Sequence, residues 1–296
     1  MKEFGDAERK IKCLLTPGTA FEYDKKNYTV IISDKPTCKS GEPKTDIYVL
    51  AKDKMGIEKE FKISYKKQNA DFIENKMNSE RAKSLFGSDW KNFIINATKS
   101  IAFGFENKKL IYKRKSGRTE KGAITLGWKF ELLNKSGGEL SGIIDLTREQ
   151  VIDVYAGTNI PEEKKNAIVD GKIIENSGIA NYLLMENDIE TAQDIFDKIY
   201  SIEEYIDKYP KVYFACKALN YRTVAKKWDG NRPLSVFVDW KVVDGKLAYD
   251  IVYDSPLITK GNEIANKLID ALNELMVDTT DDITNYNVAD FDVVLE

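Results

Sequence analysis

The pattern of apolar and polar residues divides the first third of the chain into a helix, three strands and further helices. Residues 2–15 carry apolar side chains at helical spacing, and Tyr28–Ser33 is rich in β-branched residues. Two more β-rich runs follow, Asp46–Leu50 and Glu60–Tyr65, separated by a short polar turn. Both alternate apolar with polar residues, which is typical of neighbouring strands that each bury one face.

Helical periodicity returns over residues 71–86 and 89–101, broken between the two by a glycine. The later predicted elements are a hairpin with arms Leu110–Lys113 and Ala123–Leu132, a strand over Leu140–Asp145, a helix from a capping box at Thr147–Gln150 to Gly157, a long helix over Glu190–Tyr209, three strands between Lys211 and Asp254 with a tight turn at Asp244-Gly245, and a helix around Ala265–Leu275.

These elements predict an α/β fold. We expect a mixed central β-sheet flanked by helices in residues 1–105, followed by a second lobe rich in antiparallel strands in residues 106–296. The absence of a Pro/Gly/Ser-rich linker at this point suggests that the second lobe packs on the first.

Two acids and a lysine lie on the paired strands in a pattern that suits metal chemistry. Asp46 opens the first strand, and Glu60 and Lys62 lie two residues apart on the second, so that period-2 geometry turns them to one face. We expect the hairpin to bring Asp46 to the same spot. Asp46 and Glu60 would then hold Mg²⁺, which prefers carboxylate oxygens, and Lys62 would position a metal-activated water for phosphodiester hydrolysis.

These residues resemble the signature of the PD-(D/E)xK nucleases, written here as Pro43-Lys44-Thr45-Asp46 followed by Glu60-Phe61-Lys62. The wider string, from PKTD to KISYKK, looks like the type II restriction endonucleases of that superfamily and covers roughly residues 20–80. One departure is that the proline stands three residues before Asp46 instead of directly before it.

The resemblance implies a restriction-endonuclease-like core with the order helix, three strands, helix. It also implies Mg²⁺ as cofactor and double-stranded DNA as substrate. In such enzymes an early helix often supplies an additional acid, which makes Glu8 and Glu22 candidates for a third acid, although each is also compatible with a solvated helix or loop surface.

Basic and amide residues that could contact DNA gather in three stretches. One leaves the second of the paired strands, one is the loop of the 110–132 hairpin, and one is a loop in which basic residues alternate with Tyr221 and Trp228. The candidate DNA-binding residues are Lys66, Lys67, Gln68, Asn69, Arg114, Lys115, Arg118, Arg222, Lys226 and Lys227. Ordinary solvated loops have the same composition, so both interpretations remain open for the two later stretches.

Composition removes several classes of enzyme. The chain of 296 residues contains no histidine, which excludes Ser-His-Asp and Cys-His catalysis and His-zinc centres. Its three cysteines form no C-x-x-C pair, and no apolar run approaches the length of a membrane span. Because the first residues lack the apolar core of a signal peptide, we expect a cytoplasmic protein. The net charge of −3 argues against indiscriminate binding of nucleic acids.

The sequence thus predicts a Mg²⁺-dependent type II site-specific deoxyribonuclease that acts on double-stranded DNA, with a homodimer as one compatible assembly. Two alternatives stay open. One is another PD-(D/E)xK DNA nuclease, of the repair or junction-resolving kind. The other is a non-catalytic DNA- or protein-binding module, in which Asp46, Glu60 and Lys62 only form a solvated surface.

Overall fold

The computed structural model describes residues 2–39, 41–68 and 72–296, and it forms a mixed α/β protein with two compact units. Unit 1 comprises Met1–Ile73 and Asp145–Lys211, and unit 2 comprises Glu74–Ile144 and Val212–Glu296. The division therefore differs from the predicted one at residue 105, because the first half of unit 2 is inserted between strands that belong to one sheet of unit 1.

Unit 1 is built on a six-stranded sheet of order β1-β2-β3-β4-β11-β12. Strands β1 to β4 form an antiparallel meander, and β11 then pairs parallel to β4. The elements are α1 (Lys2–Leu14), β1 (Ala20–Tyr23), β2 (Lys26–Asp34), β3 (Ile47–Asp53), β4 (Glu58–Lys66), α5 (Arg148–Ala156), α6 (Glu162–Lys165), β9 (Ile168–Val169), β10 (Lys172–Ile173), β11 (Tyr182–Met185), α7 (Ala192–Lys198), β12 (Tyr200–Ser201) and α8 (Ile202–Lys208).

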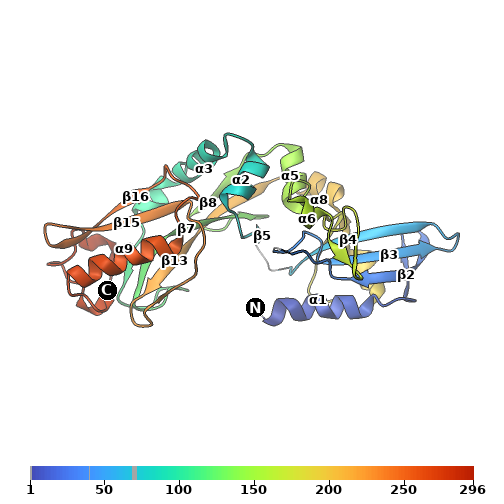
Figure 1. Cartoon of the computed structure of the whole chain (residues 1–296), viewed down its shortest axis with the longest axis horizontal. Helices are drawn as coiled ribbons and strands as arrows, with labels where there is room; N and C mark the ends of the chain where they lie inside the picture. Colours follow the sequence, from blue (N-terminus) through green and yellow to red (C-terminus); the bar gives the residue numbers. More distant parts are fainter. Residues whose placement is uncertain (1, 40, 69–71) are drawn as a thin grey trace. The chain divides into compact units, whose positions relative to one another are not determined.

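The predicted alternation of the two paired strands is confirmed by their burial. Every second residue from Ile47 to Ala51 and from Phe61 to Tyr65 lies in one apolar core, which α1 joins through Ile11 and which also contains Leu15, directly after the helix. Helix α1 runs alongside this sheet, and α5, α6 and α8 cluster together (Figure 1). Because this face of the sheet is covered, the residues between the buried positions are turned to the opposite face.

Two predicted helices are shorter than their hydrophobic periodicity suggests. The run over 190–209 is divided into α7 and α8, because Ile199 has extended backbone (φ −72°, ψ 144°) and Ser201 caps α8 in a capping box with Glu204. The first helix after the paired strands begins only at Ser79, capped by the side chain of Asn78. The predicted capping box before α5 is confirmed.

Unit 2 is built on a nine-stranded sheet with β7 near its centre and the path β14-β13-β7-β15-β16. Its strand pairs are antiparallel apart from β6 with β17, among the strands that the structure describes. The elements are α2 (Ser79–Phe86), α3 (Trp90–Lys99), α4 (Ala102–Glu106), β6 (Ile111–Tyr112), β7 (Ala123–Leu133), β8 (Ser141–Ile144), β13 (Val212–Arg222), β14 (Lys227–Trp228), β15 (Val236–Val243), β16 (Lys246–Val252), α9 (Gly261–Glu274), the 3₁₀ turns Thr280–Asp282 and Phe291–Val293, and β17 (Val294–Leu295), with β5 (Phe72–Glu74) at the division between the units.

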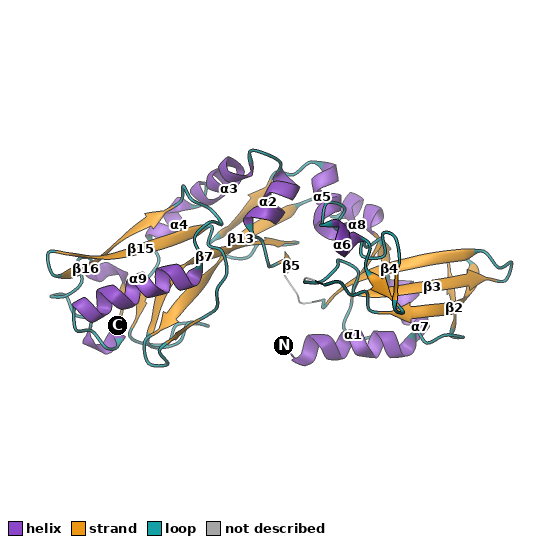
Figure 2. Ribbon diagram, in the orientation of Figure 1, coloured by secondary structure: helices purple, strands orange, loops and turns teal. Residues whose placement is uncertain are grey.

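The core of unit 2 forms between this sheet and its helices. Helix α9 buries an apolar face that includes Ile264, Leu268 and Leu272 and lies along the sheet (Figure 2). Phe105 of α4 packs edge-to-face on Trp128, with ring centroids 4.8 Å apart. The lobe predicted to be rich in antiparallel strands is therefore present, with its first helices drawn from residues that the sequence pattern assigned to the nuclease core.

Gly127 allows β15 to approach β7 closely, and we expect its replacement to be costly. A Cβ atom at this position, where φ is +150°, would lie 2.6 Å from the Val236 carbonyl oxygen and 2.7 Å from Phe237 Cα. Gly127→Ala should lower the free energy of unfolding by about 2–5 kcal/mol, combining backbone strain with overpacking. Gly138, with φ +95° and open space around it, is the control: Gly138→Ala should cost only about 1–2 kcal/mol. Urea denaturation measures both, and equal losses would contradict the role of close strand approach.

Candidate active site

The register between β3 and β4 decides which side chains lie beside Asp46. Ile47 pairs with Ile63, and continuing this register by one residue places Asp46 beside Ser64. The Ser64 hydroxyl is 3.4 Å from Asp46 Oδ2, as this pairing requires. Glu60 lies four residues before Ser64 in β4, which separates the two residues by about 13 Å at the usual rise per residue.

The predicted convergence of Asp46, Glu60 and Lys62 is therefore not formed. Glu60 accepts a hydrogen bond from the Tyr48 hydroxyl, and its other oxygen is 3.7 Å from Lys62 Nζ. Tyr48, Glu60 and Lys62 thus form a cluster of their own. It lies on the sheet face that carries Asp46, but toward the end of β3 and the start of β4. Alternation along the strands correctly predicted the shared face, but it leaves the offset between the two strands undetermined.

Asp46 is instead accompanied by residues from the end of β4. Its Oδ2 accepts a hydrogen bond of 2.7 Å from the Tyr65 backbone N–H and lies 3.9 Å from Lys66 Nζ. The side chains of Asp46 and Lys66 are 19% and 23% exposed, so this ion pair is only partly solvated. Lys66 stands two residues after Ser64 and thus occupies the position relative to Asp46 that was predicted for Lys62.

A sequence signal for Lys66 does exist. The string KISYKK places Lys62 two residues before Ser64 and Lys66 two residues after it, and Ser64 lies opposite Asp46 in the strand register. The ion pairs distinguish the two lysines, because Lys66 contacts Asp46 and Lys62 contacts Glu60. The three residues beside Asp46 are therefore Ser64-Tyr65-Lys66, in place of the expected Glu60-Phe61-Lys62. Ser64 has a hydroxyl at the position where the PD-(D/E)xK signature has a carboxylate.

Glu8 of α1 is a second carboxylate, and its charge acts on Asp46. Its Oε2 is 2.6 Å from the Nζ of Lys35, the residue that follows β2. Burial raises the pKa of Asp46 above its ordinary value, and the charge of Glu8 adds to this rise, while Lys66 and the Tyr65 N–H oppose it. The predicted third acid therefore lies close enough to influence Asp46 electrostatically.

Glu22, the other candidate acid, lies elsewhere. It is an exposed residue of β1, which is separated from β3 by β2, and its backbone pairs with the Gln193 side chain. Lys67 is half-buried beside the site, and Gln68 is exposed with its backbone N–H 3.1 Å from Asn187 Oδ1. Asn69 lies outside the described residues.

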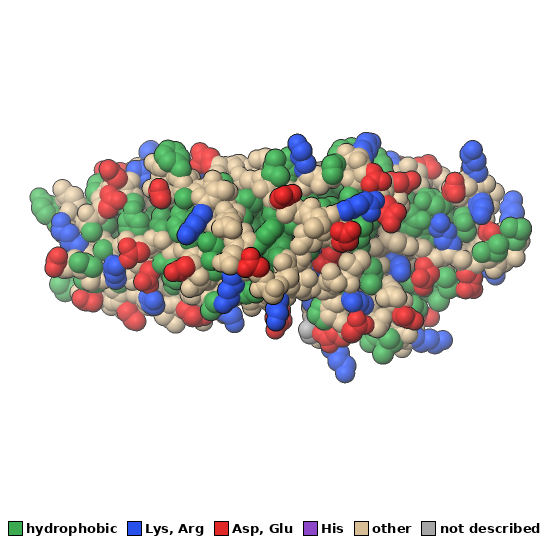
Figure 3. Space-filling view, turned by 90° about the horizontal axis from the view of Figure 1, so that it is seen from above, with side chains coloured by type: hydrophobic (Ala, Val, Ile, Leu, Met, Phe, Trp, Pro, Cys, Tyr) green, Lys and Arg blue, Asp and Glu red, His purple; other side chains and the backbone are tan. Residues whose placement is uncertain are grey.

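Several of the basic residues predicted to contact DNA are paired with acids of unit 2. These pairs are Lys115 with Glu120 at 3.1 Å, Arg222 with Asp229 at 2.7 Å and Lys226 with Asp278 at 2.6 Å. Lys and Arg side chains are also interspersed with Asp and Glu on the face drawn in Figure 3. A phosphate approaching these three residues would have to replace a carboxylate, so they are weaker candidates for DNA contact than the sequence suggested.

Arg114, Arg118 and Lys227 differ from that group. All three are exposed, and no carboxylate lies within ion-pair distance of them in the part of the chain that the structure describes. They remain the candidates for phosphate contact in unit 2.

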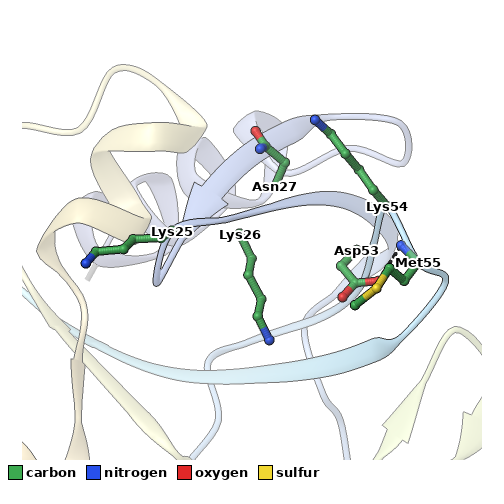
Figure 4. A pocket seen from close by; sticks show the side chains of 6 residues that line it. All are labelled: Lys25, Lys26, Asn27, Asp53, Lys54 and Met55. Carbon is green, nitrogen blue, oxygen red and sulfur yellow. Dashed lines mark hydrogen bonds between the residues drawn. The ribbon is translucent and has the colours of Figure 1, made fainter.

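A hollow of about 220 Å³ lies at the turns β1–β2 and β3–β4 (Figure 4). Its lining residues are Lys25, Lys26, Asn27, Asp53, Lys54 and Met55. It opens at the end of β3 opposite to Asp46, so it is separate from the acidic site. The three lysine side chains point in different directions and do not converge on a common point, and the Asp53 Oδ1 is held by the backbone N–H groups of its own turn.

The carboxylates around Asp46 are few for a metal site built from protein side chains alone. Over residues 2–39, 41–68 and 72–296, no group of three or more His, Cys, Asp or Glu side chains is placed to hold one. Mg²⁺, however, is commonly bound through one or two carboxylates, with water and phosphate completing its coordination. Asp46 can supply one such carboxylate, and Glu8, whose charge acts on Asp46, is the candidate for a second.

Comparisons with protein-family models, with curated proteins and with solved structures find no match for this chain. No helix in the described part of the chain is both long and apolar enough to cross a membrane.

The raised pKa of Asp46 predicts a pH-dependent gain in stability when its charge is removed. An acid whose pKa is raised by folding destabilises the folded state when it is ionised, and this cost vanishes at acid pH, where the carboxyl is protonated in both states. In EDTA at pH 7, Asp46→Asn should therefore raise Tm, by about 2–4 °C for each kcal/mol of relieved repulsion. The gain should disappear below about pH 4. Thermal unfolding between pH 4 and 7 measures this, and an unchanged or lower Tm at pH 7 would contradict it.

Proposed function

We propose that this chain is a Mg²⁺-dependent endonuclease that hydrolyses phosphodiester bonds of double-stranded DNA, as a sequence-specific restriction enzyme does. The observation that carries the proposal is the pairing of Asp46 with Lys66. A partly buried carboxylate and an ammonium group lie 3.9 Å apart on neighbouring strands, at the place where β3 begins and β4 ends. We infer that an enzyme of this kind acts in the cytoplasm.

The topology of unit 1 supports this proposal. Helix α1 precedes the antiparallel strands β1, β2, β3 and β4, of which the short β1 is additional to the three expected, and α5 then leads to β11, which is parallel to β4. Helix, three strands and helix is the order expected for a restriction-endonuclease-like core. Here the helix after the strands is α5, and unit 2 residues are inserted before it.

The residues around Asp46 suit the chemistry of phosphodiester hydrolysis. Asp46 and Glu8 would hold Mg²⁺, which when bound lowers the pKa of a coordinated water and neutralises charge on the phosphate. Lys66 is placed to orient the attacking water or to stabilise negative charge that develops on the phosphate oxygens. Glu60 and Lys62 receive no catalytic role, because they interact with Tyr48 and each other away from Asp46.

DNA cleavage by four variants tests whether Asp46 and Lys66 form the active site. Wild-type protein with Mg²⁺ should cut mixed plasmid DNA, whereas Asp46→Asn and Lys66→Met should each reduce the rate by at least about 10²–10³-fold, because charge stabilisation at the phosphate is lost. Glu60→Gln and Lys62→Met are the matched controls, since they remove the same charges from the same two-strand hairpin. Both controls should keep cleavage within about tenfold of wild type.

The outcomes separate the alternatives. Loss of cleavage in Lys62→Met with normal cleavage in Lys66→Met would overturn the assignment of Lys66 as the lysine of the active site. Discrete fragments from the wild type indicate a restriction enzyme, whereas cutting confined to damaged or branched DNA indicates a repair or junction-resolving nuclease. DNA binding without cleavage in Mg²⁺ or Mn²⁺ would replace the proposal by a non-catalytic DNA-binding module.

Charge pairing in unit 2 predicts which basic residues matter for DNA affinity. Replacing both Arg114 and Arg118 by Ala should weaken binding to all duplexes and make the dependence of log K on log salt less steep by about 1.8, or about 0.9 for each phosphate contact. Lys115→Ala is the control from the same loop, because its charge is already matched by Glu120. Gel shifts in EDTA over a range of salt concentrations measure the slopes. An unchanged slope in the double variant would make this loop an ordinary solvated surface.

A further inference from the structure

The last residues of the chain form an acidic segment that lies on basic loops of unit 2 (red in Figure 1). Residues 278–296 contain six acids and no lysine or arginine. The acids are Asp278, Asp281, Asp282, Asp290, Asp292 and Glu296. Apolar side chains anchor the segment, because Ile283, Val288 and Val293 are buried, and β17 near its end pairs with β6. The acids are therefore carried on a backbone that is held against unit 2.

Two acids at the start of this segment are paired with lysines of the loops that were considered for DNA contact. Asp278 Oδ1 is 2.6 Å from Lys226 Nζ, and the Asp278 carbonyl oxygen accepts a hydrogen bond of 2.7 Å from the same ammonium group. Asp281 Oδ2 is 2.8 Å from Lys121 Nζ. The two lysine side chains are 52% and 55% exposed, so both ion pairs are open to water and dissolved ions.

The far end of the segment contacts the first arm of the 110–132 hairpin. Glu296 Oε1 is 3.8 Å from Lys113 Nζ, and this ammonium group donates a hydrogen bond of 3.0 Å to the Ile283 carbonyl oxygen. Lys109 donates a hydrogen bond to the Asp292 carbonyl oxygen. Oxygen atoms of one segment thus accept from lysines of two separate stretches of the chain, as the oxygens of a phosphate backbone do in DNA complexes.

The acids of the segment have two different kinds of partner. Asp282 Oδ2 accepts hydrogen bonds from the backbone N–H groups of Asp278 and Thr279, at 3.1 and 2.8 Å, and so caps the turn at the start of the segment. The carboxylates of Asp278, Asp281 and Glu296 contact only the lysines, among the residues that the structure describes. Their charges can therefore be removed without loss of a cap.

Unpaired basic residues lie next to the covered lysines. Arg114 directly follows Lys113, and Lys227 directly follows Lys226. Neither Arg114 nor Lys227 has a carboxylate within ion-pair distance in the described part of the chain. Exposed ion pairs contribute little to stability, so a phosphate that reaches the unpaired side chains can also replace a carboxylate at the neighbouring lysine.

We propose that residues 278–296 are a built-in competitor of the DNA phosphate backbone for Lys113, Lys121 and Lys226. The segment stays anchored by its apolar side chains, while phosphates of a bound duplex replace its carboxylates at the lysines. In the free protein the segment lowers the affinity of the basic loops for DNA of any sequence. The inference rests on the proposed binding of DNA but not on cleavage.

DNA binding by a triple variant of the full chain tests this role. Asp278→Asn, Asp281→Asn and Glu296→Gln together remove the competing charges and keep the apolar anchors. Binding of a duplex of mixed sequence is measured by gel shift in EDTA over a range of salt concentrations. The variant should bind about tenfold more tightly than wild type, and the dependence of log K on log salt should become steeper by up to about 0.9 for each lysine. The reason is that no freed carboxylate takes up a cation in exchange.

The matched control removes the same charge from acids of unit 2 that are exposed and in no ion pair among the described residues. It carries Asp244→Asn, Asp270→Asn and Glu274→Gln, and it should bind within about twofold of wild type with an unchanged slope. Adding Lys121→Met and Lys226→Met to the first triple variant should abolish most of its gain. If that triple variant does not fold, Asp278→Asn and Asp281→Asn are measured singly, each with a smaller gain in affinity.

Equal affinities and slopes in the two triple variants would overturn the proposal and leave the segment as a structural part of the sheet. A gain that persists without the two lysines would overturn it as well, since it would reflect net charge alone. Absence of DNA binding by wild type and all variants would refute both this role and the proposed function. Tighter DNA binding by the first triple variant of a protein that cuts no DNA would support the competitor and refute the nuclease, so the two failures are distinguishable.

Discussion

The pairing of β3 with β4 is the constraint on which the candidate site depends. One face of each strand is fixed by burial, because Ile47, Val49, Phe61 and Ile63 are all within 1% of complete burial. Shifting the register by one residue would place these side chains on the opposite face and expose them, and a shift by two would leave the adjacent strands and helices mismatched. Asp46 consequently meets Ser64 and Lys66, and the acidic site follows from apolar packing on the other side of the same sheet.

Local pattern predicted the strands that carry the site, the helix before them and the capping box before α5, because these elements depend on neighbouring residues. It failed where the structure is determined by contacts between segments that are distant in the sequence. The partner of Asp46 depends on an offset between two strands, and alternation alone allows several offsets. The helix over 190–209 was divided because Ser201, a strong cap, lies within an uninterrupted apolar period. The early acid Glu8 stays a candidate, and its link to Lys35 is visible only in three dimensions.

Charge at the site and in part of unit 2 is arranged as internal pairs. At the site each acid has a lysine, and in unit 2 the C-terminal acids Asp278 and Asp281 pair with Lys226 and Lys121. Basic side chains that are already paired with acids attract DNA less strongly without regard to sequence. For a sequence-specific enzyme, weak background binding leaves more molecules free to reach cognate sites.

The discontinuity of unit 1 has a consequence for the order in which the protein folds as it is synthesised. Strand β11, the parallel neighbour of β4, emerges from the ribosome only after β7 and β8 of unit 2. These two strands must then wait for β13, because β13 pairs with both and lies beyond the last residue of unit 1. Unit 1 can thus be completed first, while β7, with ten of its eleven residues buried in the final structure, remains without its principal partner. This long, almost fully buried strand is therefore exposed to misassociation during translation, and slow elongation between β8 and β13 would prolong that exposure.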